Sequence, residues 1–441
     1  MSFTSAQLAA YVSGVLHGEG ETVCCGAEID TRQRVEGKVF FALKGEHVDG
    51  HAYVNQAVKN GCSAVVVERL ARTVEVPQIV VQNTREALFA LARARRSEMG
   101  LSSVIAVTGS VGKTTTKDIL GCLLGDNVVV SRKSFNNDLG VPLTILAGEQ
   151  AECLVAEIGA NDVGEIEPLA KLVQPDVAIL TSIEKAHLEG FKNTETVLQE
   201  KAKLLQQVPA GGFVIVPDFI DLSGVSIDAH IVTVGITETA DIVVETGVNE
   251  QGFATLGMDG AFITLSLLGE HNAMNAALAI VAVLKSSNSF LIDELLQRAS
   301  HAKAPIGRLQ RQKIDGVTFL NDSYNANPAS MRSALALLNK MQAKRKVVVL
   351  GDMLELGESS HAEHRALISN VSKIQADVVV LVGNAMESAG CSTAMHLPNA
   401  DTLEEVVPLF QRGDLVLVKG SRGLQLERLI EMFQQTKVLE H

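Results

Sequence analysis

At 441 residues, the chain is too long for one hydrophobic core and predicts two to four domains. A composition of 46% hydrophobic and 20% charged residues is typical of a soluble globular protein, and the net charge of −13 argues against a nonspecific nucleic-acid binder, which needs a basic surface. No apolar run is long enough to span a bilayer, and the first residues lack the basic and apolar regions of a signal peptide, so we expect a cytoplasmic protein without membrane insertion. The six cysteines include no Cys-x-x-Cys pair, so neither a zinc site nor a disulfide framework is indicated.

The N-terminal part of the chain predicts a small α/β unit. A helix rich in Ala and Arg, expected over 84–99, leads through Gly100 toward the next strand. Because glycine commonly ends a helix, we place the first domain at residues 1–99. Before that helix we expect strands over 38–43 and 63–67 and a helix around 53–60.

The stretch Val104–Lys117 is the most informative in the chain, because a β-branched run, a glycine turn, a lysine and three threonines follow one another there. Gly109 and Gly112 allow successive backbone N–H groups to face one anion, and the helix N-terminus behind them adds partial positive charge. Lys113 would reach the β- and γ-phosphates, and Thr114 would offer its hydroxyl to Mg²⁺. An ordinary glycine turn is the alternative, but it does not explain the lysine and the threonines. We predict that ATP is held by Thr108, Gly109, Ser110, Val111, Gly112, Lys113, Thr114 and Thr115.

The central part repeats strand and helix, which is the pattern of a buried parallel sheet. Glu157 ends one of these strands, where an acid can hold Mg²⁺ beside a phosphate loop, although it can also be a solvated carboxylate. A boundary follows 304–308, so we place an ATP-binding domain at residues 100–308. The strands expected here are 104–107, 153–158, 177–180 and 213–216.

Several polar residues of the central part have two interpretations. His187, at a strand-to-helix turn, is either a structural residue or a ligand. Lys201 and Lys203 lie on the next predicted helix, where lysines usually form a solvated face. Asn272 and Asn275 open an alanine-rich helix and suit the edge of an adenine, although Asn272 would serve equally well as a helix cap.

The last third of the chain, residues 309–441, predicts another parallel sheet. Glycines follow three of its strands, where an open sheet presents its ligand-binding edge. The loop 351–357 and the strand exit 419–422 could clamp a small zwitterion, with carboxylates facing its ammonium and Arg422 its carboxylate. The strands expected here are 317–321, 346–350, 377–382 and 415–418.

Polar groups are dense around the start of this last part. The guanidinium of Arg308 suits the γ-phosphate, although a lone arginine near a linker is more often an ion-pair partner. In the strand exit 321–328, Asp322 could accept a hydrogen bond from a ribose hydroxyl. Tyr324 could offer its ring and phenol to the nucleotide.

In this order, the motifs resemble the Mur ligase family, and the resemblance covers nearly the whole chain. The segments Asp322–Pro328 and Ala186–Phe191 are especially characteristic of the branch that adds D-alanyl-D-alanine. The resemblance rests on Thr108-Gly-Ser-Val-Gly-Lys-Thr-Thr115, Phe135-Asn-Asn-Asp-Leu-Gly-Val-Pro-Leu143, Glu157-Ile-Gly-Ala-Asn161, Ala186-His-Leu-Glu-Gly-Phe191, Gly269-Glu-His-Asn-Ala-Met-Asn275, Asp322-Ser-Tyr-Asn-Ala-Asn-Pro328 and Lys419-Gly-Ser-Arg422.

The resemblance implies an α/β protein of three domains: a small α/β N-terminal domain for a UDP-sugar, a central P-loop parallel-sheet ATPase domain, and a C-terminal Rossmann-like domain that brings an amine. It also implies two Mg²⁺ ions, one of them held by a lysine that CO₂ carbamylates; Lys201 matches that position and Lys203 is the second choice. The implied catalytic residues are Lys113, Lys201, His187 and Arg308; the metal ligands are Thr114, Glu157, His187 and Lys201; Asn272, Asn275, Arg308, Asp322 and Tyr324 join the ATP site. The implied substrate residues are Thr31, Arg32, Lys44, Asp49, His51, Asn136, Asn137, Asn325, Asn327, Asp352, Glu355, Ser421 and Arg422.

Two positions depart from the family pattern, since Val111 and Ser182 stand where the family often has Asn. Val111 supplies only its backbone N–H, so nucleotide binding should survive. The change at Ser182 affects one polar contact near the substrate.

The implied activity is the ATP-dependent joining of D-alanyl-D-alanine to UDP-N-acetylmuramoyl-tripeptide through an acyl phosphate, with release of ADP and phosphate. Its partners are small molecules and not nucleic acid, the expected state is a monomer, and the third peptide residue is either meso-diaminopimelate or L-lysine. One alternative is another acid–amine ligase of the superfamily, such as the enzyme of the preceding step or folylpolyglutamate synthase. Another is a P-loop ATPase that acts as a switch, which would release phosphate without an acceptor amine.

Overall fold

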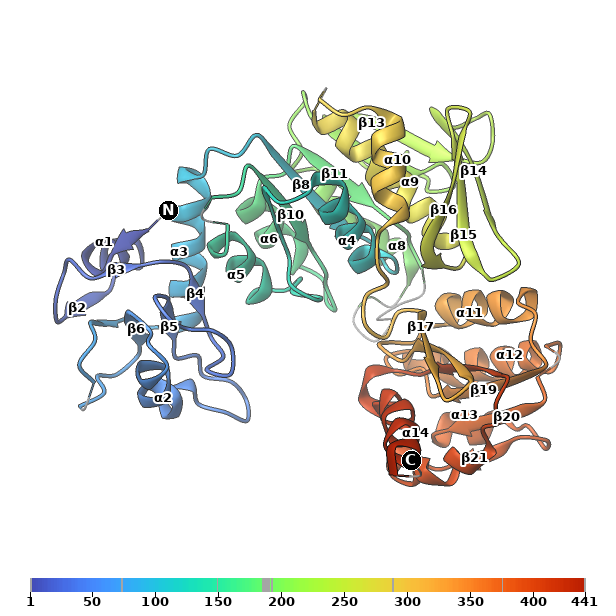
Figure 1. The fold of residues 1–441 in the computed structure, drawn as a ribbon. Helices are drawn as coiled ribbons and strands as arrows, with labels where there is room; N and C mark the ends of the chain where they lie inside the picture. Colours follow the sequence, from blue (N-terminus) through green and yellow to red (C-terminus); the bar gives the residue numbers. More distant parts are fainter. Residues whose placement is uncertain are drawn as a thin grey trace.

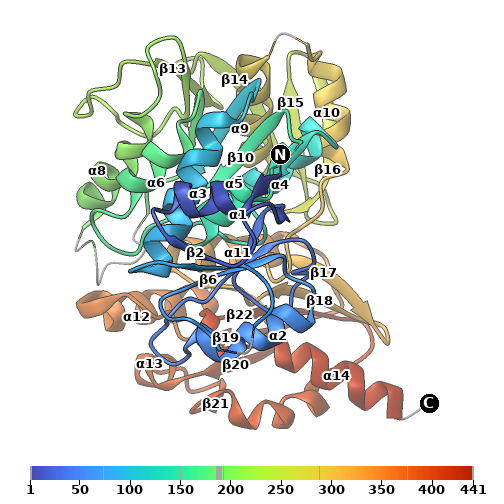
Figure 2. The ribbon, with the colours of Figure 1, turned by 90° about the vertical axis from the view of Figure 1, so that its left-hand side faces the viewer.

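Three α/β parts form an arch in the computed structural model (Figure 1). The N-terminal part and the C-terminal part each attach to the central part and lie apart from each other. Figure 2 shows the molecule from the side of the N-terminal part, which lies in front in that view. Among the residues that are described, no helix combines the length and the apolarity needed to cross a membrane. The described residues are 2–72, 74–148, 150–184, 191, 193–287, 289–374 and 376–439.

The N-terminal part contains a five-stranded sheet in the order β2-β7-β6-β5-β4, parallel except where β2 pairs with β7. The predicted strands and helices are confirmed, although the strand expected over 38–43 covers only Val39–Phe41. The long helix α3 begins after Asn83, whose side chain accepts hydrogen bonds from the N–H groups of Arg85 and Glu86. Because α3 also packs against α5 and α6, it joins this part to the central part. The elements are β1 Phe3–Thr4, α1 Ser5–Tyr11, β2 Val15–His17, β3 Val23–Cys24, β4 Ala27–Glu28, β5 Val39–Phe41, α2 Val54–Lys59, β6 Ala64–Val67, β7 Gln78–Val80 and α3 Thr84–Glu98.

The central part contains a nine-stranded sheet in the order β16-β15-β14-β13-β12-β11-β8-β10-β9. Strands β8, β10, β11 and β12 are parallel, as predicted, and β9, β13 and β14 extend the parallel set. Successive residues of β8 face different cores: Val104 and Ala106 pack on one side, Ile105 and Val107 on the other. Both faces are therefore covered, which explains the continuous apolar runs. The elements are β8 Ser103–Thr108, α4 Lys113–Leu124, β9 Val128–Val130, α5 Gly140–Leu146, β10 Cys153–Glu157, α6 Ile166–Val173, β11 Val177–Leu180, α8 Thr194–Leu205, β12 Phe213–Pro217, β13 His230–Gly235, β14 Ile242–Val248, β15 Phe253–Met258, β16 Ala261–Leu268, α9 His271–Ser286 and α10 Ile292–Ser300.

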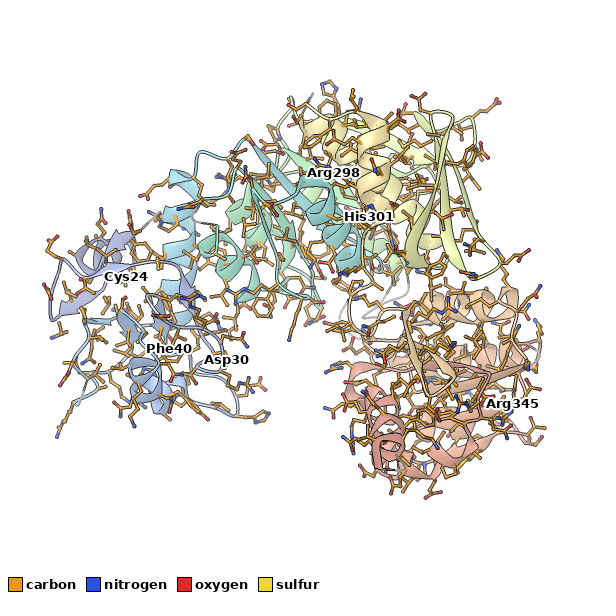
Figure 3. All side chains as sticks on the ribbon, viewed as in Figure 1. Cys24, Asp30, Phe40, Arg298, His301 and Arg345 are labelled. Carbon is orange, nitrogen blue, oxygen red and sulfur yellow. The ribbon has the colours of Figure 1, made fainter. Side chains whose placement is uncertain are left out.

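The antiparallel extension β14-β15-β16 was not predicted. β14 and β16 mix buried and exposed residues, with Leu265 buried and Phe262 63% exposed, so these two strands lack the apolar run that marks the buried strands. Helix α10 packs against β16 and is tied to α4, since the guanidinium of Arg298 (Figure 3) donates to the carbonyl of Leu123 at 2.5 Å.

The C-terminal part contains a six-stranded sheet in the order β17-β18-β22-β19-β20-β21, parallel except for β17. Its two apolar faces are covered by separate cores, as the Rossmann-like prediction requires. The elements are β17 Gln310–Ile314, β18 Val317–Asp322, α11 Pro328–Lys340, β19 Arg345–Gly351, α12 Ser360–Val371, β20 Val378–Val382, α13 Asn384–Ala389, β21 Met395–Leu397, β22 Asp414–Lys419 and α14 Glu427–Leu439.

A cluster of three phenylalanines holds one face of this C-terminal sheet. Phe319 is fully buried and its ring centroid lies 5.3 Å from those of both Phe410 and Phe433. Truncation to alanine removes these contacts and leaves a cavity, so we expect Phe319→Ala to destabilise this part by about 3–5 kcal/mol. Thermal unfolding and hydrogen exchange of β18 measure the loss. The control is Phe262→Ala, at the exposed position, which should change stability by no more than about 0.5 kcal/mol; equal effects of the two would contradict the packing account.

Candidate active site

The phosphate loop lies where the sequence predicted it, between the end of β8 and the start of α4. Gly109 and Gly112 have φ values of 149° and 88°, in the region that favours glycine. A Cβ on Gly112 would lie 2.6 Å from Oδ1 of Asn275, so the loop also requires glycine for space. The first turn of α4 begins at this loop, and N–H groups in the first turn of a helix lack partners within the helix, as an anion site requires. Within the loop, the N–H of Val111 donates to Oγ of Ser182 at 2.9 Å.

Lys113 folds back over this loop. Its Nζ donates to the carbonyls of Gly109 at 2.5 Å and Ser110 at 3.2 Å. Desolvation in the cleft lowers the pKa of Lys113 to about 8; nearby Glu157 opposes this effect, and the Arg308 cation adds to it. A bound polyphosphate would replace the two carbonyls as a partner and favour the charged amine.

Glu157 and Thr114 lie beside the loop with oxygen atoms suited to a cation. Glu157 is fully buried, and its Oε1 accepts a hydrogen bond from Nδ2 of Asn136 at 2.8 Å. Its Oε2 is buried and has no hydrogen-bond partner among the described residues. Thr114 is buried, with Oγ1 3.2 Å from Oγ of Ser134. A buried unpaired carboxylate oxygen is costly alone and suits a divalent cation, so these residues fit the Mg²⁺ that the sequence implies.

Replacing this carboxylate by its neutral isostere tests the metal role. We expect Glu157→Gln to raise the Mg²⁺ concentration for half-maximal nucleotide binding at least about tenfold, since the amide keeps the shape but removes the charge. Calorimetric titration of Mg²⁺ in the presence of ADP measures this. The matched control is Glu167→Gln, at an exposed carboxylate paired with Lys171, which should bind Mg²⁺ and ADP like the wild type. An unchanged Mg²⁺ requirement in Glu157→Gln would refute the assignment.

The two candidate lysines of α8 have different surroundings. Lys201 is 2% exposed, and its Nζ lies 5.9 Å from the ring centroid of Phe191. Desolvation lowers the pKa of Lys201 to about 7, and the neighbouring Lys113 cation adds to this effect. Lys203, in contrast, is paired with Glu200 at 2.5 Å. His187 lies outside the described residues.

Asn272 and Asn275 lie on α9 against the phosphate loop. Both are buried; Nδ2 of Asn272 donates to the carbonyl of Leu268 and Nδ2 of Asn275 donates to Oδ1 of Asn272. The alternative of Asn272 as a helix cap is wrong, because Glu270 occupies the cap position.

A cleft of about 540 Å³ runs between the phosphate loop and the strand ends of the C-terminal part. On its C-terminal side, the guanidinium of Arg308 lies 4.4 Å from the ring centroid of Tyr324. The carboxylate of Asp322 accepts from the backbone N–H of Leu309 and pairs with Nζ of Lys419 at 2.7 Å. The predicted residues that line the cleft are Ser110, Val111, Gly112, Lys113, Thr115, Asn136, Glu157, Asn272, Asn275, Arg308, Asp322, Tyr324, Asn325 and Asn327.

Lys419, from the predicted strand exit 419–422, also lines the cleft, and the lining residues that sequence reasoning missed include Ser134 and a lobe formed by Asp218, Phe219 and Ile236. The last three follow β12 and β13, so their place at the carboxyl ends of parallel strands was the available signal.

Most of the residues predicted to clamp a zwitterion lie outside this cleft. Asp352 accepts from the N–H groups of Ala385 and Met386 and so holds the start of α13. Ser421 accepts from the N–H of Leu354, and Arg422 pairs with Glu427 at 2.5 Å. Glu355 is exposed on the same loop.

Asn325, Asn327 and Asn137 each hold their own backbone turn. Asn327 caps α11 through the N–H of Ser330, and Asn325 accepts from the N–H of Ala326. Asn137 accepts from the N–H of Gly140 at the start of α5.

In the N-terminal part, Asp49 and His51 form an internal network. Nδ1 of His51 lies 2.7 Å from Oδ1 of Asp49, its Nε2 accepts from the N–H of Glu68, and Asp49 also pairs with Arg69. The Arg69 and His51 bonds hold the pKa of Asp49 below its usual range. Both ring nitrogens of His51 are therefore committed to the fold.

The other three predicted N-terminal substrate residues are more accessible. Arg32 is 87% exposed and pairs with Asp30 (Figure 3). Thr31 is half-buried and Lys44 is exposed.

A lysine-bearing glycine loop at the carboxyl end of a parallel sheet, with a buried acid beside it, defines a P-loop nucleotide-binding protein. Its cleft is shared with a second α/β sheet, which provides room for another reactant. Family models match along the chain: "Mur ligase family, catalytic domain" at residues 26–96, "Mur ligase middle domain" at 107–283, and "Mur ligase, glutamate ligase domain" at 307–422. The chain belongs to the Mur ligase family.

Two similar proteins of known sequence carry the same name. UDP-N-acetylmuramoyl-tripeptide–D-alanyl-D-alanine ligase of Haemophilus influenzae is 34% identical, over 98% of both chains, and that of Bacillus subtilis is 33% identical, over 97% of both. Among solved structures, MurF from Acinetobacter baumannii matches with a TM-score of 0.86 at 32% identity, covering 99% of each chain. MurF ligase from Thermotoga maritima, solved in complex with ADP, matches with a TM-score of 0.79 at 27% identity, covering 95% of this chain and 99% of that one.

Proposed function

We propose that this protein is a cytoplasmic, ADP-forming ligase of peptidoglycan precursor synthesis that joins D-alanyl-D-alanine to UDP-N-acetylmuramoyl-tripeptide at the cost of ATP. The observation that carries the proposal is the cleft that the phosphate loop shares with the C-terminal strand ends. The full-length similarity to ligases of that name supports the choice of substrates.

The chemistry that this site must support has two steps. A carboxylate oxygen of the peptide attacks the γ-phosphorus of ATP, the bond to the β,γ-bridging oxygen breaks, and ADP leaves an acyl phosphate. The amine nitrogen then attacks the acyl carbon, a proton leaves the nitrogen, and phosphate departs as the C–O bond breaks. Lys113 and Arg308 line the cleft from its two sides and would neutralise charge on the transferring phosphoryl group.

Thr114, Glu157, His187 and Lys201 are the residues we propose for two Mg²⁺ ions. When bound, Mg²⁺ would stabilise negative charge on the phosphate oxygens. Carbamylation of Lys201 by CO₂ needs a neutral amine, and a buried lysine with a pKa near 7 supplies one at neutral pH. Lys203, paired with Glu200, is the poorer candidate.

We also propose that each domain binds one substrate: residues 1–99 bind the UDP-sugar, residues 100–308 bind ATP, and residues 309–441 bind the amine substrate. The N-terminal and C-terminal parts lie apart in Figure 1, so they must approach each other for the reaction. Such closure would exclude water, which would otherwise hydrolyse the acyl phosphate. A monomer contains all three parts.

Phosphate release with a panel of acceptors tests this function. We expect release with D-alanyl-D-alanine, but not with D-glutamate, diaminopimelate or L-glutamate, and only when a UDP-linked tripeptide is present. Tripeptides ending in meso-diaminopimelate and in L-lysine are both supplied. Release with another acceptor would indicate a different ligase of the superfamily, and release without any acceptor would indicate a P-loop switch.

A further inference from the structure

Lys117 is a buried lysine outside the proposed catalytic set. It lies one turn after Lys113 on α4 and is 2% exposed. Its Nζ donates to the carbonyls of Ser131 at 2.8 Å and Lys133 at 3.1 Å and pairs with the carboxylate of Asp118. It does not line the cleft. Because burying an ammonium is costly unless its hydrogen bonds are made, these bonds indicate what the lysine holds in place.

The segment that Lys117 holds, residues 131–136, will be called the connector segment. Its side chains contact Thr114 and Glu157, two of the three candidate metal ligands that the structure describes; Lys201 is the third. Oγ of Ser131 accepts from the backbone N–H of Glu157 at 3.0 Å, and Nδ2 of Asn136 donates to the carboxylate of the same residue. Oγ of Ser134 lies 3.2 Å from Oγ1 of Thr114.

The connector segment contains a residue with a strained backbone, Lys133, whose own carbonyl accepts one of the two bonds from Lys117. Lys133 has a φ of 48°, a left-handed conformation that L-residues rarely adopt. The ammonium of Lys117 bonds the carbonyl of this residue and that of Ser131, two positions earlier. These bonds therefore favour the strained backbone over the extended one.

The opposite side of the connector segment is fixed to the N-terminal part. Nη1 of Arg132 lies 3.1 Å from Oε2 of Glu28, a buried carboxylate on β4 that also lies 3.6 Å from Nζ of Lys38. Arg132 therefore connects the segment to the N-terminal part, while Lys117 bonds its backbone from the side of α4.

We propose that Lys117 is a positioning residue, which acts through the connector segment to hold Thr114 and Glu157 where they bind Mg²⁺ beside the nucleotide. The inference rests on the Mg²⁺ and nucleotide site of the proposed function and adds a residue to its support. It separates two roles for lysines one turn apart: Lys113 faces the phosphates, and Lys117 orders the metal ligands.

ADP binding with and without Mg²⁺ tests this role in the full-length protein. In Lys117→Met the methylene stem remains and the ammonium is lost. We expect its affinity for ADP in excess Mg²⁺ to fall about 10–100-fold, the effect typical of residues that orient metal ligands, while its affinity for Mg²⁺-free ADP stays as in the wild type. The matched control is Lys171→Met, at an exposed lysine paired with Glu167, which should keep the wild-type response to Mg²⁺.

Two outcomes overturn the inference. If Lys117→Met responds to Mg²⁺ like the wild type, Lys117 does not position the ligands. If it loses affinity equally for both forms of ADP, the lysine supports the loop as a whole and not the metal ligands. If Mg²⁺ did not change the affinity of the wild-type protein for ADP, the proposed metal site itself would be contradicted. Failure of the metal site can therefore be distinguished from failure of the inference about Lys117.

Ser134→Ala serves as the second variant should Lys117→Met not fold. It removes only the hydroxyl that meets Thr114, at a half-buried position. A smaller loss of affinity, confined to ADP with Mg²⁺, supports the inference, and an unchanged response to Mg²⁺ overturns it.

Discussion

Lys113→Ala should lower the rate of ligation by about 10²–10³-fold or more, the range seen when one preorganised charge-stabilising group is removed. Lys113 is the cation of the phosphate loop, and its ammonium donates to the carbonyls of Gly109 and Ser110 in that loop. Its removal leaves the backbone turn, which is set by the glycines, unchanged. Phosphate release at saturating substrates measures the loss, with circular dichroism to check the fold.

The matched control for this prediction is Lys171→Ala, which removes a lysine from an exposed i,i+4 pair with Glu167. Such pairs contribute little to stability, so this variant should turn over as the wild type does. Retained turnover in Lys113→Ala would contradict the assignment of the phosphate loop.

Lys201→Met should lower activity by about 10²-fold or more, because a bound metal ion contributes several kcal/mol of charge stabilisation. Lys203→Met, two residues along the same helix, should lower it far less, since its ammonium is paired with Glu200 and not with the site. In ¹³C-bicarbonate, nuclear magnetic resonance should show a carbamate signal in the wild type and in Lys203→Met but not in Lys201→Met.

If Lys203→Met lost more activity than Lys201→Met and lacked the carbamate signal, Lys203 would be the carbamylated residue. A wild-type protein without any carbamate signal, and with full activity after removal of CO₂, would exclude carbamylation altogether.

The phosphate loop could be predicted from the sequence because its requirements are local. Positive φ at Gly109 and Gly112 and a lysine at the start of the helix are all encoded within a few residues. The parallel sheets were equally visible, because strands covered on both faces are continuously apolar. The extension β14-β15-β16 escaped prediction because β14 and β16 expose part of their side chains and so lack a continuous apolar run.

Residues whose partners come from distant parts of the chain could not be predicted from local pattern. Asp352 resembled a ligand for an ammonium group, but the backbone of Ala385 and Met386 occupies its carboxylate. His51 resembled a substrate residue, yet Asp49 and the N–H of Glu68 use both of its ring nitrogens. Lys117 belongs to the motif that carried the prediction, but its role depends on a segment that follows the next strand.

The central claim is that the terminal phosphoryl group of ATP passes to a carboxylate in this cleft. The most direct measurement uses UDP-N-acetylmuramoyl-tripeptide whose reacting carboxylate carries ¹⁸O, together with D-alanyl-D-alanine and ATP, and determines the mass of the released phosphate. If an acyl phosphate forms, one ¹⁸O atom from the carboxylate appears in each phosphate released, ADP is the nucleotide product, and the peptide product keeps the other oxygen. Unlabelled phosphate, or AMP in place of ADP, would contradict the account.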